Sequence, residues 1–438
     1  MRPIIHPAEQ ICQIMARIYG KNLTTVSGGN LSLKDDEGNI WVSPSGGDKA
    51  SLKRTDVCRI LEDGTTVGNA KPSLEFRIHN GIYARRHDIK AVLHAHSPAL
   101  VAMSIIRSLP NVRLLPDVFE MTGEAGLAPY ALPGSDALVE SVGGVFAEGY
   151  DVVILENHGI FCGSRIDLYD AYRKFEALEF SVQTEMMAGM LSAETTQLTD
   201  SQIAAYTELK NRKYDIIDTA EPTNEEILLR QQICDLSKRA YDKQIFSYAN
   251  GNFSARTSDG GMIITPEGVD NSCLSEQELV KVCGNRCEKG KVPSRMAYFH
   301  SLIYEKCPDI CSVVIAAPPY AATFAVTGEP FDVRVIPECF NRLQTCRTFS
   351  FDEFINEPEK IAEYLKLNTP IAIVQNGFFI VCSVSPFAAY DRLEIAEYTS
   401  KSIHLTKMMG SSIITISDDN IEALKNRFKI PKPEKAHL

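Results

Sequence analysis

The hydrophobic positions of this chain change their period every few residues, which predicts short helices and strands in alternation. Apolar residues recur at helical spacing in four stretches of the first half, where we expect helices: 8–19, 73–86, 98–106 and 165–191. Short apolar or alternating runs bounded by Gly, Asn and Ser predict strands between them: 29–34, 39–43, 56–61 and 90–95. Because strands and helices are mixed in short pieces, we expect an α/β sandwich around a central sheet.

The second half of the chain repeats this pattern. SGGNLSL (27–33) aligns with ANGNFSA (249–255), and WVSPSGGD (41–48) aligns with IITPEGVD (263–270). Further on, ILENHGIFC resembles IVQNGFFIVC, and AYRKFEALEF resembles AYDRLEIAEY. Since the order of the motifs is the same in both halves, the sequence predicts one domain that has been duplicated.

This repeat defines the expected domain organisation. The first copy spans residues 1–195 and the second spans residues 225–410. A polar segment with one predicted helix, 196–224, is the candidate linker between them. The remaining residues, 411–438, form a C-terminal tail whose last part, PKPEKAHL, is expected to be frayed.

Composition narrows the class of protein. The 438 residues carry a net charge of −11 with no basic block, which argues against nucleic acid as the main partner. No apolar run approaches the roughly 18 residues that cross a bilayer, and the N-terminus lacks the pattern of a signal peptide. The 12 cysteines are mostly scattered singly through apolar stretches, which is typical of a reducing cytosol. We therefore expect a cytoplasmic protein that acts on neither membranes nor nucleic acid.

Two cysteine pairs at C-x3-C spacing leave one alternative open. Cys283 with Cys287, and Cys307 with Cys311, are conceivable as a four-cysteine zinc site. The simpler interpretation is that they are small core or turn residues of a β-rich region, because the spacing is looser than C-x2-C and no Gly-rich knuckle accompanies it.

A group of three histidines and one glutamate carries the strongest chemical signal. His94 and His96 lie two residues apart in a strand-like run, so both side chains point to one face of the sheet. On their own they would fit two exposed histidines equally well. A third residue, His158, follows another apolar strand, and Glu75 lies in the first predicted turn of the 73–86 helix. Three imidazoles and a carboxylate at the ends of buried elements are what a catalytic divalent metal requires.

The turns that precede these residues offer a place for an anion. SGGN (27–30) and SPSGG (43–47) supply backbone N–H groups and hydroxyls. Ser73, the predicted N-cap of the 73–86 helix, adds a hydroxyl and the positive end of that helix. Each turn alone is weak evidence, since Ser/Gly turns are usually only turns. Together they predict an anion nest suited to a phosphate group.

The combined motifs resemble those of the class II aldolase/adducin family. They are SGGNLS, SPSG, KPSLE with Glu75, the H-A-H of His94 and His96, and N-H-G with His158. The resemblance implies two tandem α/β/α domains, each with a central, mainly antiparallel sheet flanked by helices. It implies that His94, His96 and His158 bind Zn²⁺ or another divalent metal such as Mn²⁺, and that Glu75 is the acid/base. It also implies six contacts to the substrate and its phosphate: Gly29, Asn30, Ser43, Ser45, Gly46 and Ser73.

The same resemblance implies an activity and its alternatives. The expected reaction is cleavage of a ketose phosphate to dihydroxyacetone phosphate and an aldehyde through an enediolate. Related members epimerise, decarboxylate or dehydrate sugar phosphates, and adducin-like members bind without catalysis. Leu74 stands where many sugar-phosphate aldolases have a second serine, and Phe119 and Glu120 stand near the place of an assisting tyrosine. These departures leave the substrate open.

The second copy lacks the chemical groups of the first. Met296 replaces Glu75, Ile315 and Ala317 replace the histidine pair, and QNGF has no histidine near residue 376. Glu267 stands where Ser45 would contact a phosphate, and its carboxylate would repel that group. We therefore expect one metal per chain, in the first copy. Family sites lie between neighbouring subunits of a four-fold ring, so the resemblance also implies a homodimer of two-copy chains that forms a pseudo-tetramer.

Overall fold

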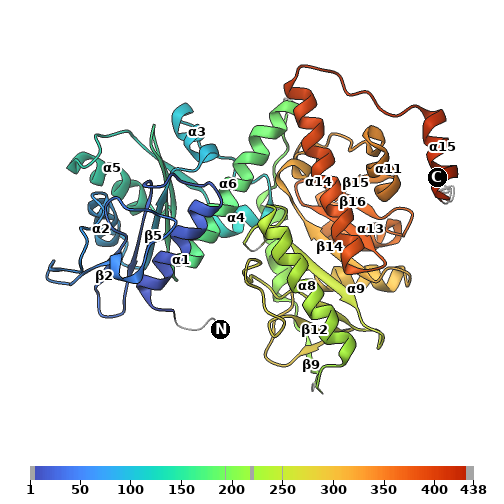
Figure 1. Ribbon diagram of the computed structural model, residues 1–438, viewed down its shortest axis with the longest axis horizontal. Helices are drawn as coiled ribbons and strands as arrows, with labels where there is room; N and C mark the ends of the chain where they lie inside the picture. Colours follow the sequence, from blue (N-terminus) through green and yellow to red (C-terminus); the bar gives the residue numbers. More distant parts are fainter. Residues whose placement is uncertain (1–4, 193, 218–220, 249, 431–438) are drawn as a thin grey trace. The chain divides into compact units, whose positions relative to one another are not determined.

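The computed structural model describes residues 5–192, 194–217, 221–248 and 250–430. The predicted frayed end, 431–438, lies outside the described residues. The chain divides into two compact units, each built of one sheet with helices packed on it (Figure 1). Unit 1 comprises residues 1–112 and 118–182, and unit 2 comprises residues 113–117 and 183–438.

The sheet of unit 1 is mainly antiparallel, as the resemblance implied. Its strands follow the order β4-β3-β2-β1-β5-β8-β7-β6, and only β6 and β7 pair in parallel. The strands are β1 (Asn30–Lys34), β2 (Ile40–Val42), β3 (Cys58–Ile60), β4 (Thr66–Val67), β5 (Ala91–Ala95), β6 (Ala125–Ala128), β7 (Val152–Leu155) and β8 (Gly159–Ser164). The apolar runs predicted as buried strands are buried throughout in β5, β7 and β8.

Helices pack against this sheet and cover its apolar residues. The helices in the first half of the chain are α1 (Pro7–Gly20), α2 (Phe76–Arg85), α3 (Pro98–Ile106), α4 (Pro116–Thr122), α5 (Asp136–Ala147) and α6 (Leu168–Leu191). A core of Ile, Val, Leu and Phe side chains joins α2 and α5 to the strands, with Phe146 and Phe161 fully buried at its centre. No helix in the described part of the chain combines the length and apolar character that crossing a membrane requires.

Helix α2 begins later than the sequence predicted. Glu75 occupies its N-cap position with no side-chain cap, whereas Ser73 was predicted to be the cap. The Ser73 backbone N–H instead donates to Ser43 O at 3.2 Å, which ties this segment to the end of β2. Ser73 O accepts from Phe76 N at 3.1 Å, forming a turn before the helix. This turn places the Glu75 side chain at the start of α2, beside the end of the sheet.

Unit 2 repeats the same sheet with an added edge. The order is β15-β16-β17-β14-β10-β11-β12-β13-β9, with parallel pairs at β15–β16 and β13–β9. The strands are β9 (Asp215–Ile217), β10 (Asn252–Arg256), β11 (Met262–Ile264), β12 (Val280–Cys283), β13 (Arg286–Glu288), β14 (Ser312–Ala316), β15 (Cys346–Phe349), β16 (Ile371–Val374) and β17 (Phe379–Ser383). Asn30 pairs with His94 in unit 1, and Asn252 pairs with Ile315 in unit 2. The equal register confirms the predicted duplication.

The helices of the second half are α7 (Asp200–Glu208), α8 (Asn224–Asp242), α9 (Ala297–Lys306), α10 (Pro319–Thr327), α11 (Pro337–Leu343), α12 (Phe351–Asn356), α13 (Pro358–Tyr364), α14 (Pro386–Met408) and α15 (Asp418–Phe428). Helices α7 and α15 follow equivalent backbone contacts in the two repeats. The residue before the α7 N-cap, Leu198, donates its N–H to Arg113 O at 2.9 Å, and Ile416 donates to Arg334 O at 2.9 Å before α15. Each repeat therefore ends in a short helix that the sequence assigned to the linker and to the tail.

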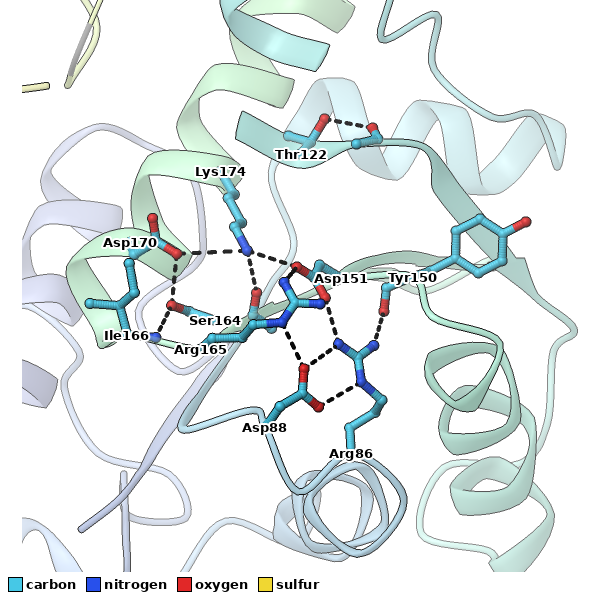
Figure 2. A network of polar contacts seen from close by, with 12 residues as sticks. Arg86, Asp88, Thr122, Tyr150, Asp151, Ser164, Arg165, Ile166, Asp170 and Lys174 are labelled. Carbon is cyan, nitrogen blue, oxygen red and sulfur yellow. Dashed lines mark hydrogen bonds and ion pairs between the residues drawn. The ribbon is translucent and has the colours of Figure 1, made fainter. Parts of the chain in front are cut away.

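An ion-pair network closes one end of the unit 1 sheet, where β7 begins and β8 ends (Figure 2). Asp151 accepts hydrogen bonds from Arg86 at 3.0 Å, Arg165 at 2.5 Å and Lys174 at 3.1 Å. Lys174 is buried and also donates to Gly163 O at 3.0 Å. Because β7 and β8 form an antiparallel hairpin, their connecting turn, which carries His158, lies at the opposite end of the sheet.

Candidate functional site

His94 lies at the centre of the unit 1 sheet with its orientation set by the backbone. It is fully buried in β5, and its ring stacks on Phe161 with centroids 4.1 Å apart. His94 Nδ1 is 2.8 Å from Ile160 O. A carbonyl oxygen can only accept, so Nδ1 carries the proton and Nε2 presents a lone pair. Such a backbone contact is the usual way in which a protein orients a metal-binding histidine.

His96 and His158 bring their rings to the same place. His96 follows the end of β5, and its Nε2 lies 2.9 Å from His94 Nε2. His158 lies in the turn between β7 and β8, where Asn157 adopts a left-handed conformation with φ of 52°. One nitrogen of each histidine lies within 4.8 Å of the others, and among the described residues these three form the group that could hold a metal ion. The predicted triad is thus brought together.

The chemistry of this donor set fits a divalent ion. Burial lowers the pKa of His94 to about 3 and also lowers the pKa of His96, so both rings are neutral. Neutral imidazoles are the form that binds zinc and similar metals. His94 Nε2 and His96 Nε2 lie only 2.9 Å apart, which is close enough for one bound cation to contact both nitrogens.

Glu75 faces the triad. Its Oε1 lies 3.1 Å from His158 Nε2, and its Oε2 lies 3.4 Å from His94 Nε2. Burial by itself would raise the pKa of Glu75, but the hydrogen bonds from His158 and Asn30 hold that pKa well below its usual range. Glu75 is therefore a carboxylate that is close enough to exchange a proton with a substrate bound at the triad.

Glycines let the backbone approach the histidines closely. A Cβ on Gly159 would lie 2.7 Å from Ala95 O and 2.8 Å from the His96 ring. Gly29 has φ of 73°, and a Cβ there would lie 2.8 Å from His94 O. The SGGN and NHG motifs therefore need their glycines for steric reasons.

The predicted substrate contacts fall into two groups. Ser45 and Gly46 are exposed in the turn after β2, and Ser73 is half-buried beside it. Gly29, Asn30 and Ser43 are buried. The Ser43 hydroxyl accepts a hydrogen bond from Leu31 N at 3.1 Å, and the Asn30 amide donates to Glu75 Oε2 at 2.5 Å. The turn thus offers open donors, whereas Asn30 and Ser43 are already engaged by the protein.

Sequence reasoning missed Lys49. Its side chain is 1% exposed, and its Nζ donates to Pro44 O at 3.3 Å. Burial lowers the pKa of Lys49, while the nearby Glu75 carboxylate raises it. A buried ammonium whose recorded hydrogen bond is to one carbonyl is uncommon and marks a candidate functional group. The signal in the sequence was a lysine two residues after the SPSGG turn and before an apolar position.

The equivalent place in unit 2 is filled by the protein's own side chains. Met296 is buried at the position of Glu75. The Glu267 carboxylate accepts from the Arg295 backbone N–H at 2.8 Å and from Arg295 Nε at 2.9 Å. A carboxylate thus binds the backbone N–H that corresponds to Leu74 in the first copy. This contact shows that the turn is able to bind an anion.

The cysteine pairs do not form a metal site in the described structure. All 12 cysteines are free, and the metal-binding geometry found among the described residues is confined to the histidine triad. Cys283 ends β12 and Cys287 lies in β13, where burial raises the pKa of both thiols. Their simpler interpretation as strand and turn residues agrees with this placement.

Comparison with known proteins matches both copies. The family described as class II aldolase and adducin N-terminal domain matches residues 9–186 and again residues 231–404. L-fuculose phosphate aldolase of Methanocaldococcus jannaschii is 34% identical over 172 residues, which is 39% of this chain and 91% of that protein. The 3-oxo-tetronate 4-phosphate decarboxylase of Escherichia coli is 28% identical over 186 residues, 41% of this chain and 86% of that protein.

Among solved structures, YgbL from Klebsiella pneumoniae aligns with a TM-score of 0.42 and 28% identity, covering 45% of this chain and 96% of that one. The family match covers well over half of the chain in two consecutive blocks. The chain therefore belongs to the class II aldolase and adducin N-terminal domain family, with two copies of the domain in tandem.

Proposed function

We propose that this protein is a metal-dependent lyase that cleaves a ketose phosphate to dihydroxyacetone phosphate and an aldehyde. The observation that carries the proposal is the Glu75 carboxylate, held 3.1 Å from His158 and 3.4 Å from His94. The similarity to L-fuculose phosphate aldolase supports the same class of reaction. The substrate is a small phosphorylated sugar, and the active centre is the one in the first copy.

His94, His96 and His158 would hold the metal, Zn²⁺ or another divalent ion such as Mn²⁺. When bound, such an ion supplies a Lewis acid that polarises a carbonyl oxygen and offsets negative charge as it develops. The chain's own contribution is to keep the imidazoles preoriented, through the Ile160 carbonyl for His94 and the turn at Asn157 for His158. Preorientation means that little reorganisation is needed when substrate arrives.

Glu75 would carry the proton. In cleavage, the hydroxyl of the carbon that becomes the aldehyde gives its proton to the Glu75 carboxylate as the bond between the two substrate carbons breaks. The electron pair of that bond stays on the dihydroxyacetone phosphate fragment as an enediolate. The protonated Glu75 then delivers the proton to the enediolate carbon, and in synthesis the Glu75 carboxylate removes it. The hydrogen bond from Asn30 favours the carboxylate, so the resting group is a base.

The turn at Ser45, Gly46 and Ser73 would hold the phosphate. The backbone N–H that corresponds to Leu74 binds a carboxylate in unit 2, which supports anion binding at the same turn of unit 1. Holding the phosphate fixes the distance from the reacting carbons to Glu75 and contributes proximity rather than chemistry.

A second candidate is decarboxylation of a phosphorylated 3-oxo acid, which would pass through the same enediolate. Lys49 favours it, because a buried ammonium near Glu75 suits a substrate that carries a carboxylate in addition to its phosphate. The similarity to 3-oxo-tetronate 4-phosphate decarboxylase points the same way.

Turnover of the metal-loaded protein tests both candidates. The substrates are a panel of ketose phosphates, assayed for dihydroxyacetone phosphate, and 3-oxo-tetronate 4-phosphate, assayed for carbon dioxide. We expect Glu75→Gln to lower kcat at least about 100-fold with metal content unchanged. Activity that survives Glu75→Gln would break the mechanism. A protein that binds no metal and turns over neither substrate would instead fit the adducin-like, non-catalytic alternative.

We further propose that the chain forms a homodimer in which the second copy of one chain covers the first copy of the other. Support comes from unit 2, where residues 113–117 and 194–208 of the first repeat cover the second copy. Thr196 N donates to Val326 O at 2.8 Å, and Asn250 Nδ2 donates to Asp117 at 2.9 Å. Both segments have equivalents in the second repeat, at 334–338 and 412–428.

The equivalent surface of unit 1 is uncovered. Ile105, which corresponds to the fully buried Val326, is 58% exposed. Tyr130, which corresponds to the 3% exposed Phe351, is 53% exposed. Segment 412–428, the second repeat's equivalent of the covering segment 194–208, is exposed too, with Ile414 at 88%. One chain thus presents both halves of a single apolar interface, and a second copy supplies the missing partner for each.

Solution mass and paired variants test this dimer. We expect the wild-type protein to have the mass of a dimer, and Ile414→Asp and Ile105→Asp each to be monomeric. Mixed together, these two variants should recover dimers, because one of the two contacts is then wild type on both sides. The matched control is Leu228→Asp, which replaces a residue of α8 that is also 58% exposed. A monomeric wild-type protein, or a mixture that stays monomeric, would refute the arrangement.

A further inference from the structure

A chain of buried hydrogen bonds leads from the interior of unit 1 toward Glu75. Ser32 Oγ in β1 lies 2.7 Å from the Tyr83 hydroxyl and 2.7 Å from His79 Nδ1. His79 is fully buried. Beyond His79 the series of hydrogen bonds is interrupted. His79 Nε2 and Asn30 Oδ1 are both buried, and neither has a hydrogen-bond partner among the residues that the structure describes. The other end of the same amide, Asn30 Nδ2, donates to Glu75 Oε2.

Unit 2 contains the same chain without the interruption. Ser254 Oγ lies 2.6 Å from the Tyr304 hydroxyl and 2.6 Å from His300 Nδ1. His300 Nε2 then lies 2.6 Å from Asn252 Oδ1. Each of these four residues is the repeat equivalent of one in unit 1. The second copy therefore shows that this set of residues is able to close a His–Asn hydrogen bond.

We infer that His79 Nε2–H donates to Asn30 Oδ1 in the working site and thereby aims the Asn30 amide at Glu75, so that both are positioning residues for the proposed reaction. This inference rests on the proposed function for its catalytic consequence, whereas the contact itself rests on the two unpartnered atoms of unit 1 and on the hydrogen bond observed in unit 2. One hydrogen bond would satisfy two buried polar atoms at once, each of which otherwise loses its interaction with water without compensation.

The inferred contact fixes the direction of each donor in this series of hydrogen bonds. Asn30 Nδ2 can only donate, and its acceptor is the Glu75 carboxylate, so Asn30 Oδ1 points toward the other side. An acceptor there requires a donor, which makes His79 the tautomer with its proton on Nε2. His79 Nδ1 is then an acceptor and takes the Ser32 hydroxyl proton. Burial lowers the pKa of His79 to about 4, so the ring is neutral and carries only that one N–H.

This contact explains why both copies retain the buried series of hydrogen-bonded residues, although the residue beyond the asparagine differs between them. In unit 2 it terminates on Asn252 beside the buried Met296, and it serves packing and hydrogen-bond satisfaction alone. In unit 1 it continues to Glu75 and holds the carboxylate at the triad. The assignment also changes the expected role of Asn30, which was predicted to contact the substrate phosphate. An amide held at both ends orients Glu75 instead, and phosphate binding falls to the turn at Ser45 and Gly46.

Matched variants of the two copies separate positioning from packing. His79→Phe removes the donor and keeps a ring, and His300→Phe makes the same change in unit 2. We expect His79→Phe to lower kcat about 10- to 100-fold with little change in KM or metal content. We expect His300→Phe to lose similar stability and keep full kcat. His79→Gln, whose side-chain amide can donate to Asn30, should recover most of the loss. Equal kcat in His79→Phe and His300→Phe, or an effect on KM alone, would overturn the inference.

A spectroscopic measurement makes the test independent of any substrate. The ¹⁵N shifts of the ring nitrogens in the metal-loaded wild-type protein report the tautomer of His79 directly. We expect a protonated Nε2 and an unprotonated Nδ1 for His79, matching His300. If no substrate of the panel is turned over, the proposed function fails, and this measurement still decides the contact. A proton on Nδ1 of His79 would overturn it.

Discussion

At the scale of single residues, the site is distinguished by neutral and charged side chains that are buried close together. Burial keeps His94 and His96 neutral, and one carboxylate is kept charged within 3.4 Å of His94 and His158. Lys49 adds a buried ammonium near that carboxylate. Placing such groups at one strand end costs folding free energy, which is the pattern expected of a binding site rather than of a stabilising core.

A variant of Lys49 tests whether the buried charge lowers stability while it serves substrate binding. Lys49→Met removes a buried charge and keeps an apolar stem of similar length. We expect the free energy of unfolding to stay equal or to rise by about 1–2 kcal/mol, because the desolvation cost of the ammonium disappears. We expect KM for the phosphorylated substrate to rise at the same time, about 10-fold. The measurements are urea unfolding and steady-state kinetics, and a less stable variant with unchanged KM would show that Lys49 is structural.

At the scale of secondary-structure elements, the sheet positions the site at one end and is closed by ion pairs at the other. His94, His96 and His158 all lie where β5 and β7 end, whereas Asp151 precedes β7 and Arg165 follows β8. Figure 2 shows Arg86, Arg165 and Lys174 converging on Asp151. The ion pairs hold the hairpin whose turn carries His158, so stability and function occupy opposite ends of the same strands.

Removing the shared carboxylate should destabilise unit 1. Asp151→Asn leaves the buried Lys174 with Asp170 as its remaining carboxylate, 3.6 Å away, and weakens two arginine contacts. We expect a loss of about 3 kcal/mol in the free energy of unfolding, as for other buried pairs that lose one partner. The control is Asp88→Asn, since Asp88 is much more exposed and should cost less than about 1 kcal/mol. Chemical denaturation measures both, and equal losses would contradict this account.

Helix α10 contributes a pH-dependent element in unit 2. The Glu397 carboxyl accepts from Ala321 N at 2.8 Å and from Tyr320 N at 3.2 Å, at the start of α10. Burial raises the pKa of Glu397 to about 7 despite these hydrogen bonds. Because the folded pKa lies above the ordinary value of 4.5, the group stabilises the fold fully below pH 4.5. That contribution is lost as the pH rises through about 7.

Glu397→Gln should remove this dependence. A neutral amide still accepts from the N–H groups at any pH, so the variant should gain stability relative to wild type between pH 5 and pH 8. We expect the free energy of unfolding of the variant, relative to wild type, to rise by a few kcal/mol across that range. Thermal or urea unfolding at several pH values measures it. A difference that is the same at pH 5 and pH 8 would show that Glu397 titrates normally.

Much of this architecture was predictable, and the exceptions have physical causes. The periodic runs predicted the strands and the motifs predicted the metal triad, because both depend on local sequence spacing. The start of α2 was predicted too early, since a turn from Ser73 to Phe76 precedes the helix and is tied to Ser43, a residue distant in the sequence. Lys49 and the link from His79 to Asn30 could not be found, because burial and hydrogen-bond satisfaction are set by tertiary packing.

At the scale of the whole molecule, the duplication separates chemistry from structure. Both copies keep the sheet, the register at Asn30 and Asn252, and the terminal helices α7 and α15. The second copy has replaced the metal ligands by Ile315 and Ala317 and has filled its anion turn with Glu267. In the proposed dimer, the second copy covers the active first copy of another chain.

The metal content of the purified, metal-loaded protein is the decisive measurement for the proposed site. We predict one tightly held divalent ion per chain by elemental analysis after dialysis. His94→Ala should reduce that number to none, because the remaining two histidines lose the ligand at the centre of the triad. Two ions per chain, or one ion that survives His94→Ala, would contradict a single metal centre built from His94, His96 and His158.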